Sequence, residues 1–194
     1  MSVLDPMKVR LTQDLEPILM LPDPRTKLSA YHDMPYAIFR YDPAEEFALR
    51  QEVAMLEVRL TQRGRRVHRI SLAECLDEAM RSQRPLPEWF AIERQMGTAT
   101  VVETITAVLD QYAPLVDLVA ARLPADPDPL RDIVFVTRTG ALFPMYRTAP
   151  LLEQLKGRLT VPAVLFYPGT LDGSHGLRFM GVLEADPNYR PKIF

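Results

Sequence analysis

Two continuous runs of β-forming apolar residues, 133–137 (IVFVT) and 161–167 (VPAVLFY), constrain the fold of this chain more than any other feature. Such runs are typical of strands with helices on both faces, because a strand with one face in water alternates apolar and polar residues. A leucine-rich helical segment that ends at Gly157 separates the two runs. The strand–helix–strand pattern therefore predicts parallel pairing within one buried sheet.

The same alternation of strands and helices runs through most of the chain. Apolar and β-branched residues predict further strands at 36–41, 67–72 and 177–183. Helical spacing of apolar residues predicts the following helices: 6–20, 42–63, 71–80 and several pieces within 86–123 that Gly97 and Pro114 interrupt. Proline-bearing segments 21–35 and 124–132 are expected to be irregular loops.

Capping signals mark where two of these helices begin. Asp42 precedes Pro43 and is followed at the third position by Glu45, which is the pattern of a capped helix start. Ser71 and Glu74 repeat this pattern before the next helix. Both helices therefore start directly after a strand, as expected in βαβ units.

The predicted fold class is α/β, with a three-layer, Rossmann-like, mostly parallel sheet. The strand at 177–183 follows its predecessor too closely for a parallel crossover, which needs a dozen residues or more, so we expect an antiparallel edge strand there. Length favours a single α/β domain over residues 1–194, with an N-terminal helix at 6–20 and a helical insertion at 86–123.

Charge and cysteine content narrow the function classes. The 23 basic and 25 acidic residues give a net charge of −2, which provides no electrostatic footprint for nucleic acid or a membrane surface. The densest basic group, residues 63–66, is expected to be a solvated cap at a helix end. Cys75 is the single cysteine and is expected in the core, which excludes an internal disulfide. We expect a cytoplasmic location and no membrane-spanning segment.

The sequence lacks the strong catalytic and phosphate-binding motifs. No P-loop, dinucleotide glycine fingerprint or nucleophile elbow is present. The histidines lack metal-ligand spacing: His68 is expected to be structural, His175 to be a solvated turn residue, and His32 stands far from both. We therefore expect no catalytic residue, no metal site, no cofactor and no enzymatic activity.

One polar constellation remains, at the predicted carboxyl ends of the strands, where open α/β sheets bind ligands. Arginines, hydroxyls and glycine amides there can hold an anion or a backbone segment of a partner. The plainer alternative is that Asp42 only caps its helix and the glycines only form turns. The candidate binding residues are Arg40, Asp42, Thr137, Arg138, Thr139, Gly140, Tyr167, Gly169, Thr170 and Asp172.

Three segments together resemble a known family. They are 34–53 (MPYAIFRYDPAEEFALRQEV), 132–157 with its turn T-R-T-G-A-L-F-P, and 161–191 with its turn F-Y-P-G-T-L-D-G. In order and spacing they are similar to the BrxB family of bacteriophage-exclusion (BREX) defence systems. The resemblance covers nearly the whole chain.

The resemblance implies a small, non-catalytic component of anti-phage defence that acts through protein–protein interaction. Its most plausible partner is the PglZ-type, phosphatase-superfamily protein of the same locus. An alternative function is a nucleotide- or phosphate-binding regulator that uses the strand-end loops. A third is a metal-dependent hydrolase that uses Asp42 and Asp172, which requires these carboxylates to converge.

Overall fold

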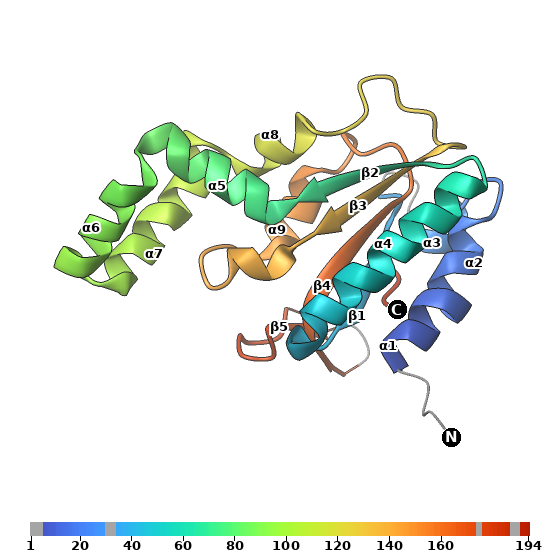
Figure 1. Cartoon of the computed structure of the whole chain (residues 1–194), viewed down its shortest axis with the longest axis horizontal. Coiled ribbons are helices and arrows are strands. Elements are labelled where there is room, and N and C mark those ends of the chain that lie inside the picture. Colours follow the sequence, from blue (N-terminus) through green and yellow to red (C-terminus); the bar gives the residue numbers. More distant parts are fainter. Residues whose placement is uncertain (1–5, 30–33, 174–175, 187–190) are drawn as a thin grey trace.

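A parallel sheet with the strand order β1-β4-β3-β2 forms the centre of the computed structural model, which describes residues 6–29, 34–173, 176–186 and 191–194 (Figure 1). The strands are β1 (Tyr36–Tyr41), β2 (Arg66–Ser71), β3 (Asp132–Thr137) and β4 (Ala163–Asp172). In register, Ala163 of β4 lies between Tyr36 of β1 and Val134 of β3. The two apolar runs thus form the inner pair of strands, which confirms the interpretation of them as strands covered on both faces.

Alternate strand residues face two separate apolar cores, so the molecule has three layers. On one face, Phe39, Phe135 and Phe166 pack with ring centroids 5.3–5.8 Å apart beneath the N-terminal helices and α4. The elements on this face are α1 (Pro6–Val9), the π-helical turn η1 (Arg10–Leu15), α2 (Glu16–Leu19), α3 (Arg25–Leu28), the 3-10 turn η2 (Pro43–Glu45) and α4 (Glu46–Gln62). The short helix α3 lies within segment 21–35, which was predicted to be an irregular loop, so that prediction is wrong for residues 25–28. Pro24 precedes its first turn, where a missing amide costs no hydrogen bond.

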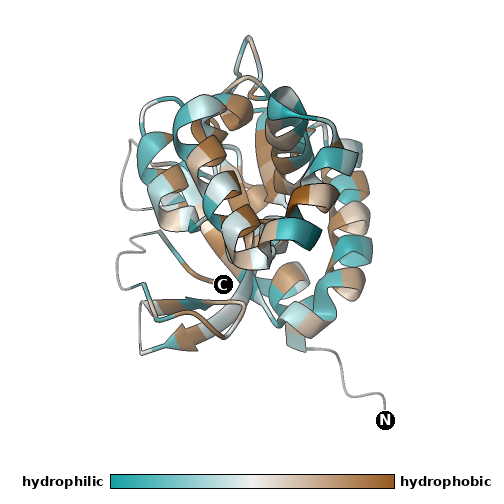
Figure 2. Ribbon diagram, turned by 90° about the vertical axis from the view of Figure 1, so that its left-hand side faces the viewer, coloured by the Kyte–Doolittle hydropathy of each residue, from teal (hydrophilic) through white to brown (hydrophobic). Residues whose placement is uncertain are grey.

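The opposite face packs Ile38, Val136 and Leu165 against the remaining helices. These elements are α5 (Leu72–Gln83), α6 (Leu86–Met96), α7 (Thr98–Ala107), the π-helical turn η3 (Val108–Tyr112), α8 (Leu115–Ala120), the 3-10 turn η4 (Thr139–Leu142) and α9 (Thr148–Gln154). Gly97 and Pro114 interrupt the helical insertion where the sequence predicted. Helices α6 and α7 form an arm that projects beyond the carboxyl ends of β2 and β3 (Figure 1), and this arm faces the viewer in Figure 2.

Trp89 fixes the base of this arm. Its side chain is buried, its indole N–H donates to the Met80 carbonyl at 3.1 Å, and the Arg84 guanidinium lies 4.8 Å above its ring. The neighbouring Phe90 is half exposed. The apolar cluster in this segment is therefore divided between the core and the surface.

The prediction that the glycine-bearing segment after Tyr167 is a loop is wrong, because strand β4 continues through it to Asp172. Residues 169–172 pair with β5 (Gly176–Phe179) in an antiparallel hairpin, so the predicted antiparallel direction is confirmed while the strand itself is shorter. Pro168 has no amide, but its carbonyl accepts the Met180 amide at 2.9 Å. A Cβ atom on Gly169 would lie 2.2 Å from the Arg178 carbonyl oxygen. The glycine thus permits close backbone approach within a strand and does not form a turn.

Residues 192–194 add a further extended segment along β1. Ile193 bridges Ile38 in parallel, and the Ile38 amide donates to the Lys192 carbonyl at 2.9 Å. The Phe194 amide donates to Ile38 at 2.8 Å, and Arg40 donates to Phe194 at 3.0 Å. The outer edge of β1 is therefore paired. No described helix has both the length and the apolar content that crossing a bilayer requires.

Candidate functional site

Three of the ten predicted residues, Thr137, Arg138 and Gly140, lie around pockets at the carboxyl end of the sheet. Arg138 follows β3 and has a left-handed backbone with φ of 60°, which turns the chain sharply into η4. Thr139 holds this turn in place because its buried hydroxyl donates to the Phe166 carbonyl at 2.7 Å. Thr139 is therefore a structural residue, whereas Arg138 remains available to the pockets.

Three further predicted residues have structural contacts at the other strand ends. The Asp42 carboxylate accepts the Ala44 amide at 2.9 Å, which confirms its role as a helix cap. Tyr167 is buried, with its ring 5.4 Å from that of Phe179. Arg40 lies on β1 and does not line either pocket. The predicted constellation is therefore not one contiguous site.

The last three predicted residues lie in the β4–β5 hairpin. Gly169 and Thr170 pair with Phe179 and Arg178, respectively. Asp172 forms an ion pair with Arg178 at 2.7 Å. Asp42 and Asp172 are thus held in separate contacts, and neither lines the pockets at the sheet end.

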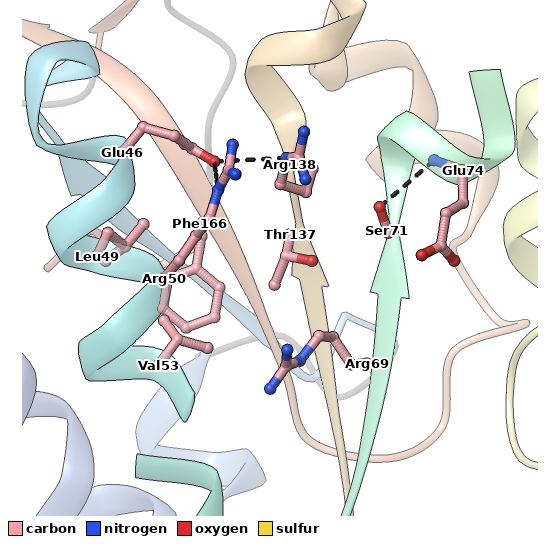
Figure 3. Close-up of a pocket in the computed structure, with 10 residues that line it drawn as sticks. All are labelled: Glu46, Leu49, Arg50, Val53, Arg69, Ser71, Glu74, Thr137, Arg138 and Phe166. Atoms are coloured by element: carbon pink, nitrogen blue, oxygen red, sulfur yellow. Dashed lines mark hydrogen bonds and ion pairs between the residues drawn. The ribbon is translucent and has the colours of Figure 1, made fainter. Parts of the chain in front are cut away.

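Arg138 belongs to a cluster whose other members the sequence did not indicate, and we call it the strand-end cluster: Tyr41, Glu46, Arg50 and Arg138. Figure 3 shows Glu46, Arg50 and Arg138. Arg50 Nε donates to Glu46 Oε1 at 2.7 Å, and Arg138 Nε lies 3.6 Å from the same oxygen. The Tyr41 hydroxyl donates to Glu46 Oε2. The cluster thus places two guanidinium groups on one carboxylate.

Burial raises the pKa of the Tyr41 phenol, and its hydrogen bond to the Glu46 carboxylate raises that pKa further. Tyr41 is therefore a neutral donor at physiological pH. The one available signal in the sequence was the four-residue spacing of Glu46 and Arg50 at the start of a helix. Such a pair ordinarily lies in solvent, so the spacing alone did not indicate a site.

Two pockets meet at the strand-end cluster. The first, which we call the α4–β2 pocket, has a volume of about 170 Å³. Its lining consists of Glu46, Leu49, Arg50, Val53, Arg69, Ser71, Glu74, Thr137, Arg138 and Phe166 (Figure 3). The second has a volume of about 210 Å³ and is lined by Pro43, Gly140, Ala141, Pro168 and Met180 together with the shared residues Glu46, Arg50 and Arg138.

A second polar cluster lies at the amino ends of β2 and β3. The buried Asp132 carboxylate accepts two bonds from Arg66 at 2.7 and 2.8 Å, one from the Asp128 amide at 2.8 Å, and contacts His68 Nε2 at 2.9 Å. Burial alone would raise the pKa of Asp132, but these hydrogen bonds more than offset it and lower the pKa below its ordinary value. The structural role predicted for His68 is therefore confirmed.

The prediction that the basic group at residues 63–66 is a solvated helix cap is wrong. Arg65 is buried, and its guanidinium donates to the carbonyls of Leu21 and Leu130. Arg66 starts β2 and binds Asp132. Only Arg63 follows the last turn of α4 as an exposed residue. The group therefore ties the helix end to neighbouring loops, which local sequence could not indicate.

Cys75 lies in the core, as predicted, and burial raises the pKa of its thiol to about 11. Such a thiol is almost entirely protonated at neutral pH and is a poor nucleophile. Among the described residues, no three His, Cys, Asp or Glu side chains are grouped closely enough to hold a metal ion. His32 and His175 lie outside the described residues.

The fold and the strand-end pockets define a three-layer, Rossmann-like α/β protein with a polar cleft at the carboxyl edge of its sheet. The sequence profile described as "BREX protein BrxB" matches residues 68–193. A curated BREX protein BrxB from Bacillus cereus (strain H3081.97) is 29% identical over 161 residues, which are 82% of each chain. No solved structure matches the chain. The chain belongs to the BrxB family of BREX phage-defence proteins, and the resemblance seen in the sequence is confirmed.

Proposed function

We propose that this protein is a non-catalytic component of its BREX system and acts by binding another protein of the same locus, the PglZ-type member. Membership of the BrxB family places the chain in a multi-component defence system, whose other members are the natural candidates for partners. The observation that carries the interaction mechanism is the outer face of α4. There, Phe47, Met55 and Val58 are 75%, 57% and 52% exposed.

The outer face of α4 carries exposed apolar side chains beside polar ones such as Gln51, whereas its inner face is apolar. Its buried side is formed by Leu49, Val53, Leu56 and Leu60. Phe47, Met55 and Val58 are spaced so that they share the opposite side of the helix. A surface helix ordinarily keeps that side polar, and contiguous exposed apolar side chains commonly mark a protein interface. This face therefore favours a partner with an apolar surface of its own.

The state of the reactive side chains supports the non-catalytic part of the proposal. The Glu46 carboxylate already accepts hydrogen bonds from Tyr41 and Arg50. His68 is engaged by the buried Asp132, and the Cys75 thiol is buried. A buried, protonated thiol and a carboxylate that two donors already occupy are poor candidates for a nucleophile or a general base.

Size-exclusion chromatography and titration with the PglZ-type protein of the same locus test the proposal. The wild-type chain is expected to co-elute with that protein at micromolar concentration. The double variant Met55→Gln/Val58→Gln keeps good helix formers but makes the outer face polar, and is expected to weaken binding about tenfold or more. Phe90→Gln is the matched control, since it removes a half-exposed apolar side chain from α6.

Separate elution of the wild-type proteins contradicts the choice of partner. Unchanged binding by the double variant, with binding intact in the wild type, contradicts the assignment of the interface to α4. Circular dichroism of each variant verifies that the fold is retained.

A further inference from the structure

Three arginines from three different elements line the α4–β2 pocket: the guanidinium groups of Arg50 and Arg138 lie beside Glu46, whereas that of Arg69 lies apart from them and pairs with Glu57. Arg50 comes from α4, Arg69 from β2 and Arg138 from the turn after β3 (Figure 3). Two glutamates, Glu46 and Glu74, share the lining. The pocket opens here because the N-terminal helices and α4 cover the inner strands, while the part of β2 that carries Arg69 and Ser71 remains partly uncovered.

Glu46 leaves the two arginines beside it incompletely neutralised. Its carboxylate makes a hydrogen bond of 2.7 Å with Arg50 and receives the Tyr41 hydroxyl. Arg138 lies 3.6 Å away, beyond hydrogen-bond distance, and its side chain is 41% exposed. Among the described residues this is the one ion pair of Arg138. Its N–H groups therefore have capacity to bind a second anion.

Hydroxyl groups supply further donors at the carboxyl ends of β2 and β3. Ser71 Oγ accepts the Glu74 amide at 3.4 Å, which leaves its own O–H proton for an acceptor in the pocket. Thr137 Oγ1 donates to the Ile70 carbonyl at 3.4 Å, a long bond that is readily exchanged for a better one. Leu49, Val53 and Phe166 form an apolar wall, where charge interactions are stronger than in water.

The volume of the pocket decides what can enter it. Pockets that enclose drug-sized ligands measure about 300–1,000 Å³, whereas this one measures about 170 Å³. A single tetrahedral oxyanion fits, and the rest of any larger molecule stays outside. Arginine forks bind phosphate with paired, charge-assisted hydrogen bonds.

We propose that the α4–β2 pocket binds a phosphate group, with Arg138 as the main donor and Arg50, Ser71 and Thr137 around it. The phosphate is either free inorganic phosphate or the exposed end of a phosphate monoester. The α4–β2 pocket itself takes the phosphate, and the rest of a monoester lies outside it, on the side of the second pocket or in solvent. Met55 and Val58 do not line this site, whereas Phe47 at the start of the same face lies with its ring centroid 4.9 Å from the Arg50 guanidinium carbon.

Thermal shift and isothermal titration with inorganic phosphate, at ionic strength fixed with chloride, test the site. The melting temperature of the wild type is expected to rise by about 5 °C or more when phosphate is about 100-fold above its dissociation constant. Arg138→Gln is expected to weaken phosphate binding about tenfold or more, because a charged donor is lost. Arg81→Gln is the matched control, since Arg81 pairs with Asp77 on the exposed side of α5 and does not line the pocket.

Two further titrations, with adenosine 5′-monophosphate and with adenosine, distinguish free phosphate from a phosphate monoester. Adenosine 5′-monophosphate that binds more tightly than inorganic phosphate indicates a monoester, and the reverse order indicates the free ion. Adenosine without phosphate is expected to give no shift. Thr137→Val, which keeps the side-chain shape, is expected to weaken binding severalfold and provides a second test where Arg138→Gln fails to fold.

Three outcomes overturn the proposal: no saturable phosphate binding by the wild type at millimolar concentration, equal binding by wild type and Arg138→Gln, or an equal loss in Arg81→Gln. Phosphate binding by Met55→Gln/Val58→Gln is expected to be unchanged. Failure of the phosphate site is therefore distinguishable from failure of the partner interface.

Discussion

Asp132 is the most completely buried carboxylate in an ion pair of the described chain, and it joins β2, β3 and the preceding loop. Its hydrogen-bond partners are Arg66 and His68, which are 66 and 64 positions away in sequence, and the nearby Asp128 amide. Because the folded-state pKa is lowered, the contribution of Asp132 to stability is complete above the unfolded value of about 3.9. That contribution disappears as pH falls through the lower, folded-state value.

Asp132→Asn is expected to lower the free energy of unfolding by about 2–4 kcal/mol at pH 7, since it removes the charge that pairs with Arg66. As pH falls from about 4 through the lower folded-state pKa, the difference from wild type is expected to shrink, because the unfolded carboxyl is protonated first and the folded one last. Urea unfolding at pH 7 and pH 3 measures both values. Asp77→Asn, which removes an exposed ion pair, is expected to cost less than about 1 kcal/mol. An equal deficit at both pH values would show that charge is not the cause.

Gly169 provides a second test at the residue scale. Gly169→Ala places a Cβ atom 2.2 Å from the Arg178 carbonyl oxygen, a backbone atom that cannot move alone. We expect destabilisation of about 2 kcal/mol or more, seen as a lower melting temperature. Gly140→Ala is the control, because its Cβ meets side-chain atoms at an ordinary 3.5 Å. Equal melting temperatures for Gly169→Ala and wild type would rule out this close approach.

At the scale of elements, local signals predicted most helices and strands. Asp42 and Ser71 cap the helices that they were expected to cap, and β1 has its predicted bounds. The error at residues 168–172 has a physical cause, since proline and glycine ordinarily interrupt strands. Here the neighbouring β5 backbone approaches so closely that only glycine fits. Local sequence does not contain that information.

The strand ends were predicted better than the site itself. Thr137, Arg138 and Gly140 could be found because they follow an unmistakable buried strand. Arg50 and Arg69 were missed because a charged residue on a helix or an edge strand ordinarily faces solvent. Arg50 and Arg69 line the same pocket only because α4 leaves part of β2 uncovered. That is a property of the tertiary structure.

The segment at residues 192–194 allows a prediction about β1. Phe194→Pro removes the amide that donates to the Ile38 carbonyl, together with the ring, whereas Phe194→Ala removes only the ring. We expect the proline variant to be less stable than the alanine variant by about 1 kcal/mol. Amide hydrogen exchange at Arg40, which donates to the Phe194 carbonyl, is expected to be faster in the proline variant. Equal exchange in the two variants would contradict pairing along this edge.

At the scale of the whole molecule, the order β1-β4-β3-β2 separates the first two strands to opposite sides of the parallel sheet. The alternation of strands and helices predicted the three layers but could not give this order, since the apolar runs are compatible with several arrangements. The result places the start of α4, the turn after β3 and the base of the β4–β5 hairpin beside one another. The second pocket exists because three distant segments meet there.

This arrangement has a consequence for synthesis on the ribosome. β1 emerges early, yet both of its neighbours, β4 and residues 192–194, are translated more than 120 residues later. At about 5–20 residues per second, the nascent β1 waits several seconds or longer with both edges unpaired. The helices α4 and α5 can form during that time because their contacts are local. The apolar strand YAIFRY is therefore the segment of the nascent chain most in need of protection by a chaperone.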